Sequence, residues 1–137
     1  SYTMAQSVIS TGSPFYSIAI TVQSTSAAIP SGTIYCRVDD DQDMRSEYIE
    51  EVSYAYGGYA GGGPYTESIE LVSSTNPTLP NGTLYFACQS SSAITVQRYN
   101  TTTTYTDGQY YYASYPSWNV TSTLSDRDMT FILKELK

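Results

Sequence analysis

The chain of 137 residues contains no histidine. Without an imidazole it cannot build a Ser-His-Asp or Cys-His catalytic site, or a zinc site with histidine ligands. It also lacks the glycine-rich signatures of a P-loop and of a dinucleotide-binding turn. Two facing carboxylates suffice for glycoside hydrolysis, but the adjacent Glu50 and Glu51 point to opposite faces of a strand. The sequence therefore predicts a protein that is not an enzyme.

Basic side chains are also scarce. Lys and Arg together number 6 against 13 Asp and Glu residues, which gives a formal net charge of −7. The basic residues are scattered, whereas nucleic-acid binding needs a clustered basic surface. An anionic membrane surface would repel this chain, and no apolar run approaches the roughly 20 residues of a membrane span. We therefore expect neither a nucleic-acid partner nor membrane insertion.

Helix-forming segments are missing, whereas Ser, Thr and 15 Tyr residues are abundant. Short apolar runs with a period of two alternate with Pro and Gly clusters, which is typical of all-β proteins. The predicted strands cover residues 3–9, 15–23, 32–38, 46–56, 66–72, 82–89, 93–98, 109–115 and 128–136. Strands at this spacing predict one antiparallel β-sandwich domain, a jelly roll of eight or nine strands, over residues 1–137.

Nearly the same phrase occurs twice, as IPSGTIYCRVDD (29–40) and LPNGTLYFACQS (79–90). The upstream segments SIAI (17–20) and SIEL (68–71) also correspond. In each turn Pro suits the first central position, and Gly is expected to adopt a positive φ. Half of the chain holds too few strands for a separate sandwich, so we predict two similar strand–turn–strand units within one domain.

Several segments follow one another in a familiar order: AQS (5–7), SIAITVQ (17–23), PSGTIYCRV (30–38), LPNGTLYFACQSS (79–91), QYYYAS (109–114) and SDRDMTFILKEL (125–136). In this order the chain resembles the jelly-roll, carbohydrate-binding-like modules of large secreted and surface proteins. The resemblance implies a β-sandwich at an extracellular or surface location and assigns no catalytic or ligand residue. The chain departs from it at Cys36 and Cys88, where aliphatic residues are usual, and in the acidic run 39–43.

The acidic run is the densest group of charges. The ligand spacing of a calcium-binding loop is matched by Asp39, Asp41, Asp43, Glu47 and Glu50. Met44 stands where the sharp turn of such a loop needs Gly, and the run follows a predicted strand instead of a helix. Two interpretations stay open, a solvated acidic loop between strands and a Ca²⁺ site as the possible cofactor.

The two cysteines follow the two matching turns. By strand alternation Cys36 shares a face with Ile34, and Cys88 shares a face with Leu84 and Phe86. Both faces are apolar and point inward, so we predict a disulfide; two separate buried thiols are the alternative. In the chain-entropy model a bridge over this loop contributes roughly 4 kcal/mol, and it fits an extracellular location.

Three sequons, at Asn81, Asn100 and Asn119, are candidate N-glycosylation sites. A second candidate surface is aromatic. It is predicted from Tyr110, Tyr112, Tyr115 and Trp118, since alternate members of QYYYASY must face outward. A sugar ring or a neighbouring subunit can stack on such residues.

Two functions are compatible with these features. The first is an extracellular structural or adhesive module that assembles with copies of itself into a surface filament, fibre or virion appendage. The uncharged segment 1–10 or the apolar segment 128–136 would then pair with a neighbouring sheet, unless both pair within their own chain. The alternative is a carbohydrate-binding module of a larger enzyme or adhesin. It would use Trp118 or the tyrosines of 110–115 beside an acidic or amide group.

Overall fold

The computed structural model describes residues 2–94, 98–99, 109–124 and 128–136. Every strand pairing in these residues is antiparallel, and the described part of the chain forms no helix. It accordingly has no helix of the length and apolar character needed to cross a membrane. The predicted all-β class is confirmed.

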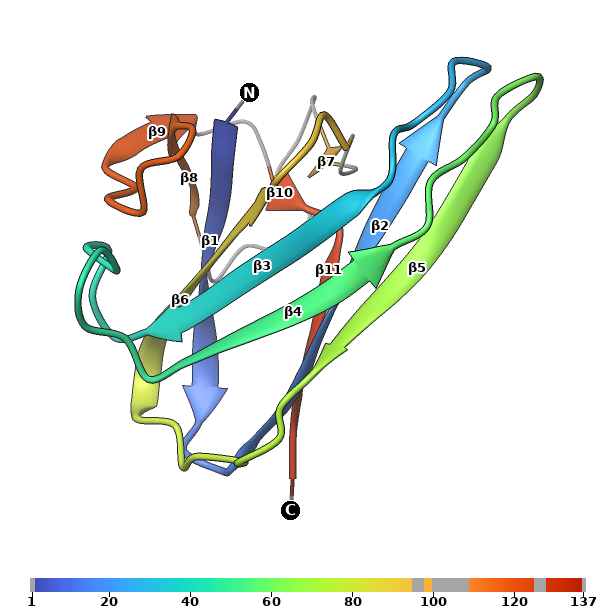
Figure 1. The fold of residues 1–137 in the computed structure, drawn as a ribbon. Coiled ribbons are helices and arrows are strands. Elements are labelled where there is room, and N and C mark those ends of the chain that lie inside the picture. Colours follow the sequence, from blue (N-terminus) through green and yellow to red (C-terminus); the bar gives the residue numbers. More distant parts are fainter. Residues whose placement is uncertain (1, 95–97, 100–108, 125–127, 137) are drawn as a thin grey trace.

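The strands form two main sheets and one short pair (Figure 1). The six-stranded sheet has the order β4 (Glu50–Tyr56), β3 (Gly32–Asp39), β6 (Asn81–Ser90), β1 (Tyr2–Thr11), β8 (Tyr110–Ser114) and β9 (Ser122–Leu124). The three-stranded sheet has the order β11 (Phe131–Glu135), β2 (Phe15–Ser24) and β5 (Tyr65–Val72). The short pair consists of β10 (Asp128–Met129) and β7 (Arg98–Tyr99).

One apolar core lies between the two main sheets. Ile18 and Ile20 of β2 are buried in it together with Ile34 of β3. The ring of Phe86 on β6 lies 5.0 Å from the ring of Phe131 on β11, centroid to centroid, and so connects the two sheets. The alternation of buried and less buried residues along β3 is that of a strand with one face on a core.

The internal sequence similarity has a structural counterpart. β2 pairs with β5, with Ile18 opposite Leu71, and β3 pairs with β6, with Cys36 opposite Cys88. Each similar unit therefore starts in the three-stranded sheet and ends in the six-stranded sheet, and the two units run antiparallel to each other. The two similar segments thus form two strand–connection–strand units that share the same pair of sheets.

The two turns differ at their glycines. Gly82 has a φ of 106°, as predicted for this position. The same prediction is wrong for Gly32, which is not among the positive-φ residues. A Cβ at Gly32 would instead lie 2.1 Å from Oγ of Ser92 and 3.1 Å from Oγ of Ser91. Any other residue at this position would have to displace the Ser92 hydroxyl, which donates to the carbonyl oxygen of Ser31 at 2.8 Å.

Both terminal strands pair within their own chain. β1 lies between β6 and β8, and β11 pairs with β2. The carboxylate of Glu135 on β11 accepts hydrogen bonds from the backbone N–H groups of Thr11 and Ser13 at 3.1 and 2.9 Å, and from Oγ of Ser10 at 3.1 Å. Both terminal strands therefore take part in the sheets of their own chain, β1 in the interior of one sheet and β11 at the edge of the other.

The predicted strand boundaries hold within a few residues for the first six strands except one. The strand expected over 46–56 begins at Glu50, because the segment before it folds across the sheet. Residues 95–97 of the predicted strand 93–98 fall outside the described part; of its three described residues, Arg98 lies in a strand, β7, and residues 93 and 94 do not. The described residues form eleven strands instead of eight or nine, because β7, β9 and β10 are short segments of two or three residues.

Candidate functional site

The side chains of β3 alternate between the core and the opposite, outer face of the six-stranded sheet. Ile34, Cys36 and Val38 are buried in the core. Tyr35 and Arg37 are only partly buried, and as the alternate residues they belong to the outer face. The register places Gln89 of β6 opposite Tyr35 and Glu51 of β4 opposite Arg37. Aromatic, amide, guanidinium and carboxylate groups are therefore neighbours on this face.

Arg37 is the centre of the outer-face cluster. Its Nε lies 2.7 Å from Oε2 of Glu51, and its Nη1 donates to the carbonyl oxygen of Met44 at 2.7 Å. The guanidinium also lies over two rings, 4.2 Å from the centroid of Tyr48 and 4.3 Å from that of Trp118. Its side chain is only 15% exposed, which strengthens these contacts. Arg37 therefore connects β3 to β4, to residues 44–48 after the acidic run, and to the β8–β9 connection.

A hollow of about 250 Å³ opens beside this arginine. It is lined by Tyr35, Arg37, Glu51, Gln89 and Trp118. Nε2 of Gln89 donates to Oγ1 of Thr3 at 3.1 Å and to the carbonyl oxygen of Pro116 at 3.2 Å, so the amide is held in place. The lining thus combines two aromatic rings with three fixed polar side chains in a shallow depression that is open to solvent.

A small second core lies beside the hollow on the same outer face of the sheet. The described members that are fully buried are Ala5, Met44, Ala87 and Val120. The small alanines on β1 and β6 leave room for Met44, which follows the acidic run, and for Val120 from the β8–β9 connection. The backbone N–H of Met44 donates to the carbonyl oxygen of Trp118 at 3.1 Å. Residues 40, 41 and 45–48 are exposed, as expected for a solvated loop between strands, whereas Met44 packs on the sheet.

The carboxylates with calcium spacing have separate surroundings. Arg45 binds both oxygens of Asp43 at 2.8 Å, and its hydrogen bonds hold the pKa of that carboxyl below its usual range. Oδ1 of Asp41 accepts the backbone N–H of Asp43 at 3.0 Å. Burial raises the pKa of Asp39 on β3, and Glu47 is exposed to solvent.

Glu50 is also bound elsewhere. Its carboxylate accepts a hydrogen bond from Thr75 at 2.8 Å and another from Ser73, in the connection after β5. The structure therefore does not bring the five predicted ligands together. Within the described ranges no three acidic or cysteine side chains are grouped so that they could hold a metal ion.

The predicted aromatic surface is only partly correct. Tyr110 is 1% exposed and belongs to the core, and Tyr112 packs against the same core. This assignment was wrong because the strand alternates in the opposite phase, so that Tyr111 faces outward beside the second core. Tyr115 is 40% exposed, and Trp118 lines the hollow.

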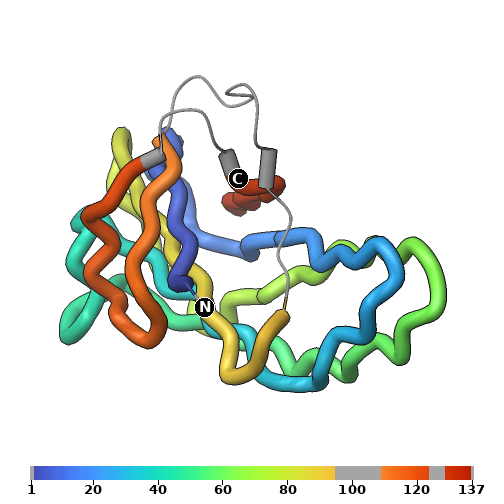
Figure 2. Tube along the Cα trace, turned by 90° about the horizontal axis from the view of Figure 1, so that it is seen from above, coloured from blue at the N-terminus to red at the C-terminus, as the bar shows by residue number. Residues whose placement is uncertain are grey.

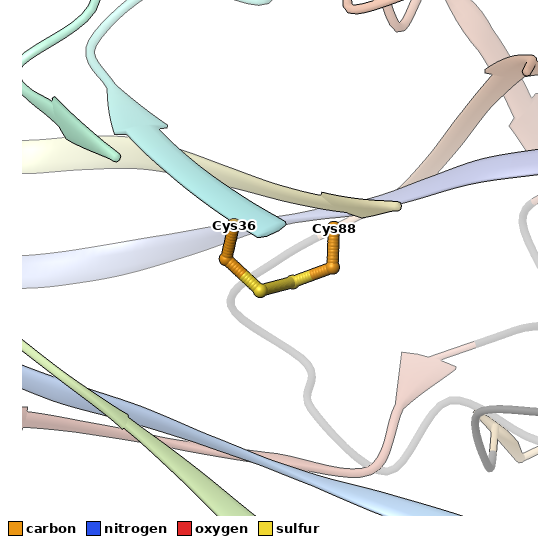
Figure 3. Close-up of a disulfide and its surroundings, with 2 residues drawn as sticks. All are labelled: Cys36 and Cys88. Carbon is orange, nitrogen blue, oxygen red and sulfur yellow. A yellow bond between two sulfur atoms is a disulfide. The ribbon is translucent and has the colours of Figure 1, made fainter. Parts of the chain in front are cut away.

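The predicted disulfide is confirmed. Cys36 and Cys88 are opposite each other on neighbouring strands, with Cα atoms 4.1 Å apart, and a disulfide joins them (Figure 3). Both residues are buried in the core face of the sheet. The bond therefore links the two similar units directly behind the outer face that carries the hollow.

The three sequons have different positions. Asn81 is exposed at the start of β6. Asn119 is partly buried and forms an isolated β-bridge with Asp43. Asn100 lies outside the described residues. Glycosylation at each of them stays a prediction.

Sequence reasoning missed most of the hollow. It selected Trp118 and an acidic or amide neighbour, but not Tyr35, Arg37, Glu51 or Gln89. A usable signal existed, because Tyr35 alternates with the inward-facing Ile34 and Cys36. The contact with Trp118 required the tertiary structure, because that residue comes from a distant connection.

Comparison with protein-family models, with curated proteins and with solved structures found no match to this chain. The disulfide is compatible with an extracellular protein, since such bonds persist in oxidising environments. The function must therefore be inferred from the residues of the site.

Proposed function

We propose that this chain is a non-enzymatic, extracellular adhesive module of the jelly-roll sandwich type, and that it binds a carbohydrate in the outer-face hollow. The observation that carries this proposal is the placement of Tyr35 and Trp118 beside the carboxylate of Glu51 and the amide of Gln89. The apolar face of a sugar ring stacks on aromatic side chains, and its hydroxyl groups exchange hydrogen bonds with carboxylates and amides.

The site is largely formed before any ligand arrives. Arg37 fixes Glu51 by an ion pair and Trp118 by stacking, while Thr3 and the Pro116 carbonyl fix Gln89. Fixing these side chains in advance reduces the entropy that binding would otherwise cost. The hollow, at about 250 Å³, is smaller than a typical small-ligand pocket, so a single sugar ring is the largest unit expected to enter it.

The charge of the site favours an uncharged sugar. The positive charge of Arg37 is paired with Glu51, and exposed Asp40 and Asp41 lie in the adjoining segment. The net charge of the chain is −7, so an acidic sugar would be repelled at longer range. We therefore expect neutral hexoses or N-acetylhexosamines to bind in preference to sialic or uronic acids.

A glycan array followed by titration of the selected sugar tests this function. We expect binding by the wild-type chain and at least about a tenfold loss of affinity in Trp118→Ala. Tyr16→Ala is the matched control, because it removes an exposed ring from the other sheet. A clean array, or equal affinity of Trp118→Ala and wild type, would contradict the proposal.

Self-association is the second candidate function. Ile132 on β11 is 56% exposed and Val72 on β5 is 48% exposed. By their pairing with Ala19 and Ser17 of β2 both lie on the outer face of the three-stranded sheet. Packing of this face against a different face of a second copy would bury them. Such a head-to-tail contact does not close on itself, so its repetition would give a filament, fibre or virion appendage.

The assembly hypothesis has its own test. Donation of β1 would break ladders on both of its sides, so we expect packing of sheet faces rather than strand donation. Light scattering and negative-stain microscopy should then show oligomers for the wild-type chain and monomers for Ile132→Lys. A chain that stays monomeric across salt concentrations would remove this candidate.

A further inference from the structure

A second structured surface lies far from the Trp118 hollow. The β2–β3 connection (25–31) and the β4–β5 connection (57–64) project together from one end of the molecule, whereas the β8–β9 connection lies at the other end (Figures 1 and 2). The two projecting connections are here called the paired tips. Their separation from the β8–β9 connection makes any site on them independent of the hollow.

Backbone hydrogen bonds join the paired tips. Ile29 and Tyr59 exchange both of their backbone hydrogen bonds at 2.9 Å each, and the N–H of Gly62 donates to the carbonyl oxygen of Ser26 at 2.9 Å. Gly61 has a φ of 91°, and a Cβ there would lie 3.0 Å from the Ser26 oxygen. The close contact therefore requires glycine, and the two connections are held as one unit.

Tyr65 stands at the base of the paired tips with its ring and hydroxyl both fixed. Its ring stacks on Tyr59 with centroids 4.2 Å apart and an interplanar angle of 12°. Its hydroxyl accepts a hydrogen bond from Tyr56 at 3.0 Å and donates one to the carboxylate of Glu67, which raises the pKa of Tyr65. The ring is thus supported from one side before any ligand is present.

A groove of about 530 Å³ runs past this tyrosine. It is lined by Gln23, Ser24, Thr25, Pro64, Tyr65 and Thr66. These side chains supply an aromatic ring, a proline ring, an amide and four hydroxyl groups, counting that of Tyr65, and none of them is charged. The lining includes the last pairs of the β2–β5 ladder, Gln23 with Thr66 and Ser24 with Tyr65. Successive pairs point to opposite faces of the sheet, so the groove lies around the end of the ladder.

We propose that this groove is a second ligand site, which binds a short uncharged saccharide against the ring of Tyr65. An uncharged lining with amide and hydroxyl groups matches the hydroxyl groups of a neutral sugar and offers no partner to an ionic group. The groove has about twice the volume of the Trp118 hollow, which suits two sugar rings. With two distant sites, one module would be able to bridge two glycan chains.

The single tryptophan allows the two sites to be measured separately. The ¹⁵N-labelled chain is titrated with cellobiose, maltose, lactose and chitobiose up to about 10 mM, a range that covers weak sugar binding. We expect at least one disaccharide to shift the backbone amides of Ser24 and Thr66 in a saturable way. Binding at the paired tips leaves the indole N–H of Trp118 unmoved, so it is distinguished from binding in the hollow.

Two variants test the groove. Tyr65→Ala removes the aromatic ring from the groove. It is expected to lower the disaccharide affinity, measured from the Ser24 and Thr66 amide shifts, at least about tenfold. Thr66→Arg fills the groove from an exposed position without touching the Tyr59–Tyr65 stack, and is expected to have the same effect. Trp118→Ala is the matched control, in which the tip-site shifts should persist.

These experiments test the groove independently of whether the Trp118 hollow binds a sugar. Saturable shifts that both groove variants remove, and that Trp118→Ala keeps, support it even if the hollow binds nothing. It is overturned if no disaccharide shifts the tip amides, or if the shifts survive Thr66→Arg. Shifts produced only by a proline-rich peptide, and by no saccharide, would also overturn it.

Discussion

The two faces of β3 and β6 belong to the same strands but carry different side chains. On the inner face the Cys36–Cys88 disulfide lies among fully buried apolar side chains. On the outer face Arg37 lies among two rings, a carboxylate and a backbone carbonyl, with a hollow beside it. Because neighbouring residues of a strand point to opposite faces, the disulfide and the proposed site are one residue apart in sequence and separated by the sheet.

The difference shows what each face contributes. The inner face is stabilised by burial and by a covalent bond that restricts the unfolded chain. The outer face is stabilised by directional contacts, which hold two connections against the sheet and leave a polar hollow open. We therefore expect changes on the inner face to act on the stability of the whole domain, and changes on the outer face to act first on the site.

The largest effect is expected from the inner face. Removal of the disulfide in Cys36→Ala/Cys88→Ala should lower the free energy of unfolding by roughly 4 kcal/mol, since the closed loop is long. Urea denaturation with and without reductant measures this. A loss below about 1 kcal/mol would show that the covalent bond is not what distinguishes this face.

A smaller effect on stability and a larger one on the site are expected for Arg37→Met. The variant loses the ion pair with Glu51, the bond to the Met44 carbonyl and the stacking with Trp118, and should be destabilised by about 2 kcal/mol. Trp118 emission should shift to longer wavelength as the ring becomes solvated. Arg37→Lys is the control that keeps the charge but not the planar fork; wild-type emission in both variants would contradict the role given to Arg37.

The contacts that the Glu135 carboxylate on β11 makes with Thr11 and Ser13 should contribute less to the free energy of unfolding. Glu135→Gln weakens the carboxylate contacts with Thr11 and Ser13, so a loss of about 1 kcal/mol is expected. Hydrogen exchange should speed up in β11, while β3 and β6 stay protected. Equal exchange of β11 in the two proteins would show that pairing with β2 alone holds this strand.

The smallest effect is a pH dependence at Glu70 on the three-stranded sheet. The hydrogen bond from Ser17 at 2.7 Å and the contact with Lys134 at 3.1 Å lower the pKa of this carboxyl below its usual 4.5. A lowered pKa in the folded state stabilises the fold above the unfolded-state pKa, and this contribution disappears as the pH falls through the folded-state pKa. Urea midpoints of wild type and Glu70→Gln should therefore converge on acidification; a constant difference would contradict the assignment.

The sequence predicted the inner face better than the outer one, for a physical reason. Burial leaves a period-two pattern, so the first six strands and the Cys36–Cys88 pairing could be predicted from local residues. The prediction assigned the wrong face to Tyr110 and Tyr112, because the tyrosines of QYYYASY fit either face and leave no period-two pattern. Tertiary packing places Tyr110 in the core.

The hollow was harder to predict because its parts are distant in sequence. Tyr35 and Arg37 reach it from β3, Gln89 from β6 and Trp118 from the β8–β9 connection. The calcium spacing of 39–50 matched a motif, but Arg45 and Thr75 give two of its carboxylates other partners. Spacing alone does not show which competing donors the fold brings to a carboxylate.

The most direct test of the central claim is the indole N–H resonance of Trp118, the single tryptophan of the chain, during titration with the neutral sugar selected by the array. Binding in the outer-face hollow predicts a saturable shift of this resonance with the same affinity that calorimetry measures. The shift should be lost or weakened in Glu51→Gln, because the carboxylate acceptor is gone. Calorimetric binding with an unmoved indole resonance, or no binding of any neutral sugar, would contradict the account.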